Sequence, residues 1–314
     1  MKVLLTSTSF QDTPGRHQTL LANQGFEITN LRGPLTDDVL LDVIGDYDAV
    51  ICGDDDFTRK VIQKGVSGRL RAISKYGIGL DKIDLKAAEE FNIPVSNCVG
   101  VNQNTVAEHV FALLLSYVKN IIPENNYLKQ QKWVRLIGNE IHGKVIGIAG
   151  LGSIGKEIAI RASAFGLKIY AFDKFEDHIF AIKYGLVYCK TIEELFSKSD
   201  ILSLNLSLNS ETEHIINTSN LAILNPGVII INTARAGLIE ESSVLKGIES
   251  GIIKAYLTDV LNEEPMIKDH PFLNYDNIII TPHIGSRTYE SVERQGTMAV
   301  ENLLRLINNK SLYK

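Results

Sequence analysis

The sequence predicts an α/β protein built from two doubly wound parallel sheets, and three observations support this fold class. Short apolar segments rich in β-branched residues alternate with helix-like segments along most of the 314 residues, as in parallel strands joined by crossover helices. Hydrophobic residues make up 45% of the chain, which is enough for the cores of two domains. A strand, a glycine turn, a helix and a second strand follow one another between Val145 and Asp173.

The first part of the chain, to about residue 98, predicts a small α/β domain of its own. Strands are expected near 3–5, 26–28, 49–52, 70–74 and 93–95, and helices near 17–25, 37–45, 58–64 and 83–91. A longer helix is expected from Thr105 to about Asn120, because Thr105 and Glu108 fit a capping box. Its apolar residues cover more than one face, which predicts burial against its own domain and against a partner subunit.

The second part of the chain predicts a larger parallel sheet. Strands are expected near 145–149, 168–172, 186–188, 201–204, 228–232, 255–257 and 278–280, and helices near 192–198, 221–224 and 240–251. The segment from about Tyr289 to the end is expected to be helical and to return to the first domain. We therefore predict a discontinuous substrate domain of residues 1–98 and 289–314, a dinucleotide-binding domain of residues 99–288, and a cleft between them.

The glycine turn carries the most specific local signal. Gly150, Gly152 and Gly155 form G-x-G-x-x-G directly after a predicted strand and at the start of a predicted helix. Glycines at this spacing permit a tight turn, a close approach of a pyrophosphate and close packing of helix and strand. Asp173 ends the next strand and lies 173 − 155 = 18 residues after the last glycine, close to the ~20 expected for the acid that binds the ribose hydroxyls. These features predict that the second of two Rossmann-like domains binds NAD, since a carboxylate at Asp173 would repel the 2′-phosphate of NADP.

Composition argues against several other functions. The net charge is −5 without a basic block, which gives no support for nucleic-acid binding. The cysteines at positions 52, 98 and 189 show neither metal-ligand spacing nor a disulfide framework, so we expect a reducing compartment and no metal. The N-terminal apolar run is too short for a signal sequence, and no run reaches the length of a membrane span. We therefore expect a cytoplasmic protein that does not bind membranes.

Three polar residues follow predicted strands of the second domain, where ligands of open α/β sheets bind. They are Arg235, Glu264 and His283. Each also has a plain alternative: a surface or phosphate-touching cation, a solvated loop carboxylate, and a core histidine among the seven in the chain. Their joint position at strand ends favours a reaction site.

A series of motifs in one order resembles the D-isomer-specific 2-hydroxyacid dehydrogenase family, which includes phosphoglycerate, glycerate and D-lactate dehydrogenases. The resemblance covers nearly the whole chain. The motifs are Tyr76–Asp84, Thr105–Glu108, the glycine turn, Asn232–Arg235, Asp259-Val260 with Glu264-Pro265, and Thr281–Gly285.

The resemblance implies specific roles. Arg235 would hold the substrate carboxylate and the reacting oxygen, for which a planar guanidinium is suited. His283 would exchange a proton with the substrate hydroxyl, and Glu264 would hold the imidazole and raise its pKa. Besides Arg235, the implied substrate-binding residues are Gly77, Ile78, Gly79 and Asn102. The implied cofactor-binding residues are Gly150, Gly152, Ser153, Ile154, Gly155, Asp173, Leu206, Thr233, Ala234, Asp259, His283, Gly285 and Ser286.

Several residues depart from the family pattern. Ala236 stands where glycine usually follows the arginine, and Ser207 replaces a usual proline. Phosphoglycerate dehydrogenases tend to place an arginine after the third strand, whereas this chain has Asp54-Asp55-Asp56, which would repel a phosphate ester. Asn102 matches the formate dehydrogenase branch, but that branch has an amide where this chain has Glu264.

The leading hypothesis is a homodimeric NAD-dependent oxidoreductase that interconverts a D-2-hydroxy acid and its 2-keto acid, with phosphoglycerate disfavoured. An alternative of another class is an NAD(H)-sensing, corepressor-like interaction protein, which could keep the same three residues. A third possibility is a family enzyme for an unusual acid, such as phosphite or a sugar acid.

Overall fold

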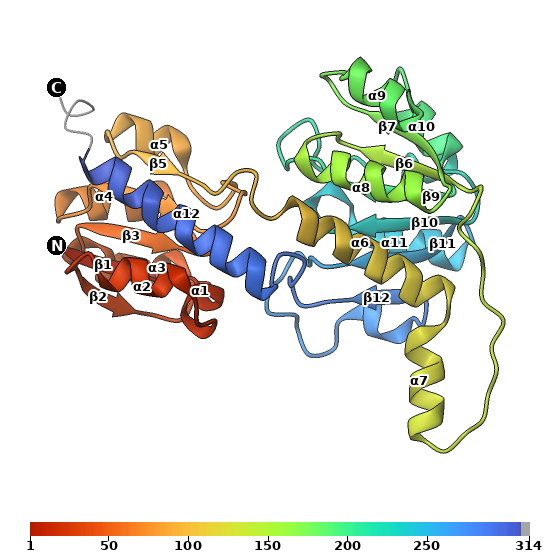
Figure 1. Ribbon diagram of the computed structural model, residues 1–314, viewed down its shortest axis with the longest axis horizontal. Coiled ribbons are helices and arrows are strands. Elements are labelled where there is room, and N and C mark those ends of the chain that lie inside the picture. Colours follow the sequence, from red (N-terminus) through yellow and green to blue (C-terminus); the bar gives the residue numbers. More distant parts are fainter. Residues whose placement is uncertain (309–314) are drawn as a thin grey trace. The chain divides into compact units, whose positions relative to one another are not determined.

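The computed structural model describes residues 1–308 and divides the chain into two compact units (Figure 1). Unit 1 contains Met1–Asn102 and the segment that begins at Arg287, and unit 2 contains Gln103–Ser286. These divisions fall a few residues from the expected domain boundaries. The roles assigned to the two domains, and the expected cleft, stay predictions. The final part of the predicted C-terminal helix, residues 309–314, lies outside the described residues.

Unit 1 is built on a five-stranded parallel sheet in the order β2-β1-β3-β4-β5. The strands are β1 Lys2–Leu5, β2 Glu27–Asn30, β3 Ala49–Cys52, β4 Ala72–Lys75 and β5 Val95–Ser96. The helices are α1 Thr8–Asp12, α2 Arg16–Ala22, α3 Asp37–Val43, α4 Arg59–Ser67, α5 Leu85–Glu90 and α12 Tyr289–Asn308, with a 3₁₀ turn η1 at Ile44–Asp46. Every residue of β3 and β4 is buried, as expected for parallel strands covered on both faces.

Helix α12 is part of unit 1 although it lies about 190 residues beyond β5 in sequence. Its buried side chains, among them Ala299 and Leu303, join the core that contains Val3 and Ile51. The Ser74 hydroxyl donates a hydrogen bond to the Ala299 carbonyl at 2.7 Å, which fixes the helix on β4.

Unit 2 is built on a seven-stranded parallel sheet in the order β12-β11-β10-β9-β6-β7-β8. The strands are β6 Val145–Ala149, β7 Lys168–Phe172, β8 Leu186–Tyr188, β9 Ile201–Leu204, β10 Val228–Asn232, β11 Ile253–Thr258 and β12 Ile278–Ile280. The helices are α6 Gln103–Val118, α7 Ile121–Lys129, α8 Ser153–Ala164, α9 His178–Tyr184, α10 Ile192–Lys198 and α11 Glu241–Glu249, with 3₁₀ turns η2 Leu221–Ile223, η3 Ala236–Leu238 and η4 Pro271–Asn274. The strand order reverses between β6 and β9, the place where such sheets bind ligands.

The expected capping box at Thr105 is wrong. Helix α6 already begins at Gln103, so Thr105 is a buried residue of its first turn rather than the residue before the helix. Much of the apolar surface of α6, including Val110 and Leu114, is buried in the core of unit 2.

No single described helix is long and apolar enough to cross a bilayer. Helices α6 and α7 together pass that test by length and composition, but their axes bend by 61°.

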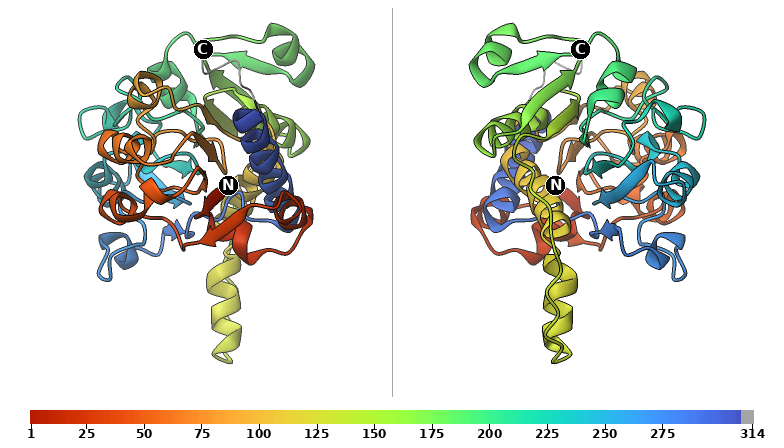
Figure 2. Two further views of the ribbon diagram at one scale, coloured as in Figure 1. Left: turned by 90° about the vertical axis from the view of Figure 1, so that its left-hand side faces the viewer. Right: turned by 90° about the vertical axis from the view of Figure 1, so that its right-hand side faces the viewer.

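Helix α7 and the segment after it are the main feature absent from the sequence-based description. In Figures 1 and 2, α7 and the chain that returns from it project away from the rest of unit 2. No residue of α7 is buried, and residues 130–140 are all exposed. We call residues 121–140 the arm.

Candidate active site

Two of the three glycines in the turn after β6 are required by the fold itself. Gly150 has a φ of +91°, and a Cβ built on it would lie 2.7 Å from the Asn205 carbonyl oxygen. A Cβ on Gly155 would lie 2.1 Å from the Gly150 carbonyl oxygen. Both contacts are with backbone atoms. A larger residue at Gly150 would separate the turn from the loop after β9, and a larger residue at Gly155 would separate α8 from the turn. Leu206, from the loop after β9, packs beside Gly150.

Gly152 is different, because the fold gives no reason for glycine there. Its φ is −67°, and a Cβ built on it would meet nothing within 4 Å. It precedes α8, whose first turn contains Ser153, Ile154 and no acidic residue. The N–H groups of that turn have no acceptor within the helix and favour an anion. A glycine that leaves open space beside these groups fits a site for a pyrophosphate.

Asp173 lies at the carboxyl end of β7, next to this turn. One of its carboxylate oxygens accepts the Leu151 N–H at 2.7 Å, and the other accepts the Phe175 N–H at 2.9 Å. The nearest cations in sequence are already paired: Lys174 with Glu211, and Lys156 with Asp177 at 2.5 Å. The carboxylate is thus fixed in orientation and keeps lone pairs for two hydroxyl donors.

Arg235 follows β10 in a turn that is organised by Asn232. The Asn232 side chain is fully buried, accepts the Ala234 N–H at 3.1 Å and donates to the Arg235 carbonyl at 2.9 Å. Arg235 itself donates to the Ala234 carbonyl at 2.8 Å and precedes the 3₁₀ turn η3. Thr233, Ala234 and Arg235 therefore lie at the carboxyl end of the sheet, beside β11.

His283 and Glu264 form a direct pair. His283 follows β12, Glu264 follows β11, and the distance from His283 Nδ1 to Glu264 Oε2 is 2.8 Å. The other carboxylate oxygen of Glu264 accepts the Leu261 N–H at 2.9 Å. His283 has a φ of +52°, a conformation that is strained for residues other than glycine and concentrates at functional sites.

Asp259 holds the backbone that carries His283. Its carboxylate is only 2% exposed and accepts the N–H groups of Ile284 at 2.9 Å and Gly285 at 2.7 Å. Burial acts to raise the pKa of Asp259, but donors from His109, Thr281 and these two amides outweigh it and leave the pKa lowered. The implied contact of Asp259 with the nicotinamide stays a prediction. Ser286 ends unit 2 directly after this loop.

The remaining substrate-binding candidates belong to unit 1. Gly77 has a φ of +113°, and the carbonyl groups of Gly77 and Ile78 accept bonds from the Cys98 N–H and the Asn97 side chain. Gly79 continues this loop after β4. Asn102 is buried, and its side-chain oxygen has no hydrogen-bond partner. The part that these residues play in the site stays a prediction.

The acidic run after β3 is less exposed than its sequence suggests. Asp55 is fully buried, accepts bonds from Thr6, Leu35 and Gly53, and has a pKa raised by burial. Asp54 and Asp56 pair with lysines of the neighbouring segment, Lys75 at 2.6 Å and Lys82 at 2.8 Å.

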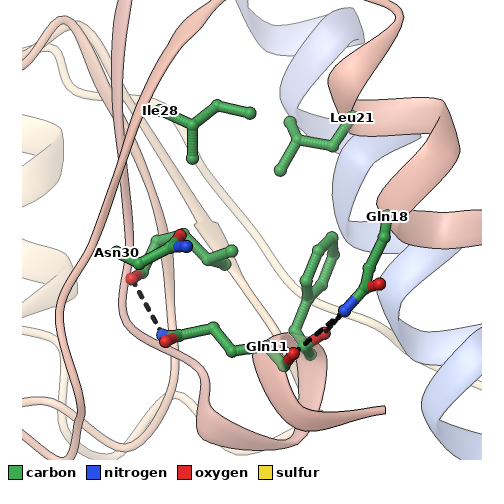
Figure 3. Close-up of a pocket in the computed structure, with 7 residues that line it drawn as sticks. Gln11, Gln18, Leu21, Ile28 and Asn30 are labelled. Atoms are coloured by element: carbon green, nitrogen blue, oxygen red, sulfur yellow. Dashed lines mark hydrogen bonds between the residues drawn. The ribbon is translucent and has the colours of Figure 1, made fainter. Parts of the chain in front are cut away.

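A pocket of about 340 Å³ lies elsewhere in unit 1, between β1, β2, α1 and α2 (Figure 3). Amide side chains of Gln11, Gln18 and Asn30 and apolar side chains such as Leu21 and Ile28 line it. Within the described residues its lining contains no charged group, so it lacks the cation that an acid ligand requires. Within residues 1–308, no cluster of His, Cys, Asp and Glu is suited to a metal ion.

The strand order, the glycine turn and the fixed acid after β7 define a dinucleotide-binding α/β protein. Residues 111–285 match the sequence model of the "D-isomer specific 2-hydroxyacid dehydrogenase, NAD binding domain". The chain belongs to the D-isomer specific 2-hydroxyacid dehydrogenase family, whose members are NAD(P)-dependent oxidoreductases. The resemblance inferred from the motifs is confirmed, and so is the α/β fold class.

Relatives support the family over most of the chain. A hydroxypyruvate reductase from Thermotoga maritima is 36% identical, and the match covers 92% of this chain and 93% of that protein. A D-3-phosphoglycerate dehydrogenase from Methanocaldococcus jannaschii is also 36% identical, over 88% of this chain, which spans only 53% of that relative. The crystal structure of the TT0316 protein from Thermus thermophilus has a TM-score of 0.87 at 30% identity, covering 98% of this chain and 97% of that one.

Proposed function

We propose that this protein is an NAD-dependent enzyme that interconverts a small D-2-hydroxy acid and its 2-keto acid. The observation that carries the proposal is the His283–Glu264 pair, held at 2.8 Å at the carboxyl end of a family dinucleotide-binding sheet. Arg235 lies at the end of β10, and β10 is separated from His283's strand only by β11.

The pair suits proton exchange. An ionised Glu264 only accepts hydrogen bonds, so Nδ1 of His283 carries the hydrogen that it shares with Glu264. Nε2 is then the ring atom that gives a proton to the keto oxygen during reduction, or takes one during oxidation. Arg235 provides a permanent, planar charge for the acid group of the substrate. The nicotinamide supplies or accepts the hydride when it is bound.

The proposed substrate is an acid without a phosphate group. A relative that is 36% identical over 92% of this chain is named hydroxypyruvate reductase, which supports a keto acid without a phosphate group. Lys75 is buried and committed to Asp54, and Lys82 is paired with Asp56. Neither pair leaves the net positive charge that a phosphate ester favours.

A panel of 2-keto acids tests the proposal. NADH oxidation is measured with glyoxylate, hydroxypyruvate, pyruvate and 3-phosphohydroxypyruvate. We expect turnover with at least one of the first three and a kcat/KM for the phosphate ester at least tenfold lower. Absence of turnover on all four contradicts the proposal. NADH-dependent capture of a protein partner together with that absence would favour the interaction-protein hypothesis.

We also propose NAD rather than NADP as the cofactor. The support is the charge around Asp173: its carboxylate faces the turn, and the nearby lysines are neutralised by acids. A 2′-phosphate beside Asp173 would meet a like charge without a cation to compensate it.

A homodimer formed through the arm is a further part of the proposal. Trp133 is 83% exposed and Ile137 is 95% exposed, and Ile121 and Leu128 are also largely exposed. Apolar patches of this kind on a projecting segment are typical of subunit interfaces. We also propose a cytoplasmic location. The support is that Cys52, Cys98 and Cys189 are buried and form no disulfide.

A further inference from the structure

One histidine of unit 2 makes a contact that the proposed reaction does not use. His109 lies in the second turn of α6, and its side chain is 15% exposed. Its Nε2 lies 2.9 Å from the Thr281 hydroxyl and 3.4 Å from the Asp259 carboxylate. Helix α6 is thereby joined to the segment just before His283.

The direction of the hydrogen bonds follows from the donors present. The Thr281 hydroxyl donates its single hydrogen to Asp259 Oδ1 at 2.6 Å. The same hydroxyl must therefore accept the hydrogen from His109 Nε2. Thr281 also has an alternative acceptor, the Thr258 carbonyl at 3.5 Å. A donor at Nε2 fixes the hydroxyl so that its hydrogen points to Asp259.

Asp259 connects the Thr281 hydroxyl to the loop of His283 by hydrogen bonds. Its carboxylate holds the N–H groups of the two residues after His283, and its own carbonyl accepts the His283 N–H at 3.0 Å. A Cβ on Gly285 would lie 2.8 Å from the carboxylate, so the loop is closely fitted around it. A buried carboxylate that loses one hydrogen-bond donor is destabilised in its position and shifts toward other donors.

We propose that His109 is a positioning residue that, through Thr281 and Asp259, holds the backbone of residues 283–285 in its left-handed turn. The inference rests on the proposed function, because it matters for catalysis only if His283 exchanges the substrate proton. A displacement of about 1 Å at such a group can cost about a hundredfold in rate.

Two pairs of variants test the donor. His109→Leu removes it, whereas His109→Gln keeps an N–H near the position of Nε2; Thr281→Val and Thr281→Ser form the matching pair at the hydroxyl. Tyr117→Phe is the control, because it removes a different hydrogen bond from α6, to the Lys254 carbonyl at 3.3 Å.

The first measurement needs no substrate. Amide hydrogen exchange at Ile284 and Gly285 in the full chain should be about tenfold faster in His109→Leu and Thr281→Val. It should stay within about threefold of the wild type in His109→Gln, Thr281→Ser and Tyr117→Phe. Unchanged exchange in His109→Leu would overturn the inference, as would equal acceleration in the Leu and Gln variants. This result stands even if no keto acid is reduced, so its failure is separate from failure of the proposed function.

The second measurement is steady-state kinetics with the best keto acid of the panel. In His109→Leu, kcat should fall about ten- to a hundredfold while the KM for NADH changes less than about threefold. His109→Gln should restore most of the lost kcat. A loss confined to KM, or an equal loss in Tyr117→Phe, would mean that His109 only packs α6 and would overturn the inference.

Discussion

His283 combines three properties at one residue: a strained φ of +52°, a carboxylate partner at 2.8 Å and a place at a strand end. A left-handed conformation costs a residue other than glycine on the order of 1 kcal/mol or more. The hydrogen bonds that the Ile284 and Gly285 N–H groups donate to Asp259 offset that cost. The side chain is held from both sides, by its ring partner and by its backbone.

The Glu264 partner provides the first prediction. Glu264→Gln should lower kcat about a hundredfold, because an amide cannot stabilise the protonated imidazole and offers a competing donor. The neighbouring Glu263 is exposed and supplies the control, so Glu263→Gln should leave kcat within about twofold. Steady-state kinetics at pH 7 checks both variants. Equal activity of Glu264→Gln and the wild type would show that the ion pair does not serve the reaction.

Asp173 provides the second prediction at the residue scale. Asp173→Asn should lower the preference for NADH over NADPH at least about tenfold, because the charge that repels a 2′-phosphate is removed while the amide keeps one acceptor oxygen. The ratio of kcat/KM for the two cofactors measures this. An unchanged ratio would place the selectivity elsewhere.

Residues at strand ends could be found from the sequence, because the end of a continuous apolar run marks where a buried strand stops. Arg235 and His283 each lie three residues beyond the end of an apolar strand, and Glu264 lies in the loop that follows β11. Asn232 belongs to one of the motifs, but its anchoring role was missed; a buried Asn two residues before the N–H that it binds is an Asx turn and could have signalled it. The contacts of Thr281 and His109 join segments 172 residues apart, which no local pattern reveals.

At the scale of elements, the glycine turn separates a role in folding from a role in binding. Gly155→Ala should destabilise unit 2, because the new Cβ meets a backbone oxygen at 2.1 Å. Gly152→Ala should leave the melting temperature within about 2 °C but weaken NADH binding at least about tenfold, since its Cβ would enter the proposed pyrophosphate site. Calorimetry and NADH fluorescence titration check the pair. Unchanged NADH affinity in Gly152→Ala would contradict the cofactor site.

The packing of α2 on α12 in unit 1 predicts a dependence on pH. His17 is fully buried between them, its Nε2 is 3.2 Å from the Phe10 carbonyl, and the built Cβ of Gly296 would touch its ring. Burial lowers the pKa of His17, against smaller raising effects of the Phe10 and Thr13 carbonyls and of Glu293 on α12. The unfolded chain therefore binds this proton more readily than the folded chain does.

Stability should consequently be full above about pH 6.5 and fall below it, by up to about 1.4 kcal/mol for each pH unit until the folded His17 is protonated. His17→Gln keeps an N–H for the Phe10 carbonyl and cannot titrate. Its urea unfolding free energy should vary less between pH 7.5 and 5.5 than that of the wild type. Equal slopes for the two proteins would show that His17 protonates without cost.

Most strands could be predicted because parallel strands buried on both faces are written as continuous apolar runs, as in β6 and β10. Helix α7 could not, because it buries no residue and therefore has no apolar face to set a period. Helix α1 has only five residues, and α9 buries only Ala181, so neither has a buried face that would set a period.

At the scale of the whole molecule, the exposed apolar residues of the arm lead us to expect a homodimer. The chain of 34.8 kDa should sediment as a dimer, and the double variant Trp133→Ser with Ile137→Asp should sediment as a monomer. Ile182→Asp on α9 is the matched control, because Ile182 is 85% exposed but lies outside the arm. Analytical ultracentrifugation measures all three. A wild-type monomer, or dissociation by the α9 variant alone, would contradict the assignment of the arm.

The central claim is that Arg235 and His283 act on an acid beside a bound nicotinamide. NADH affinity and keto-acid turnover, measured side by side in Arg235→Ala and His283→Ala, test it most directly. We expect kcat/KM to fall at least about 10²-fold in each variant, while the Kd for NADH stays within about threefold in Arg235→Ala. Either variant turning over like the wild type, or losing activity only in step with NADH binding, would contradict the claim.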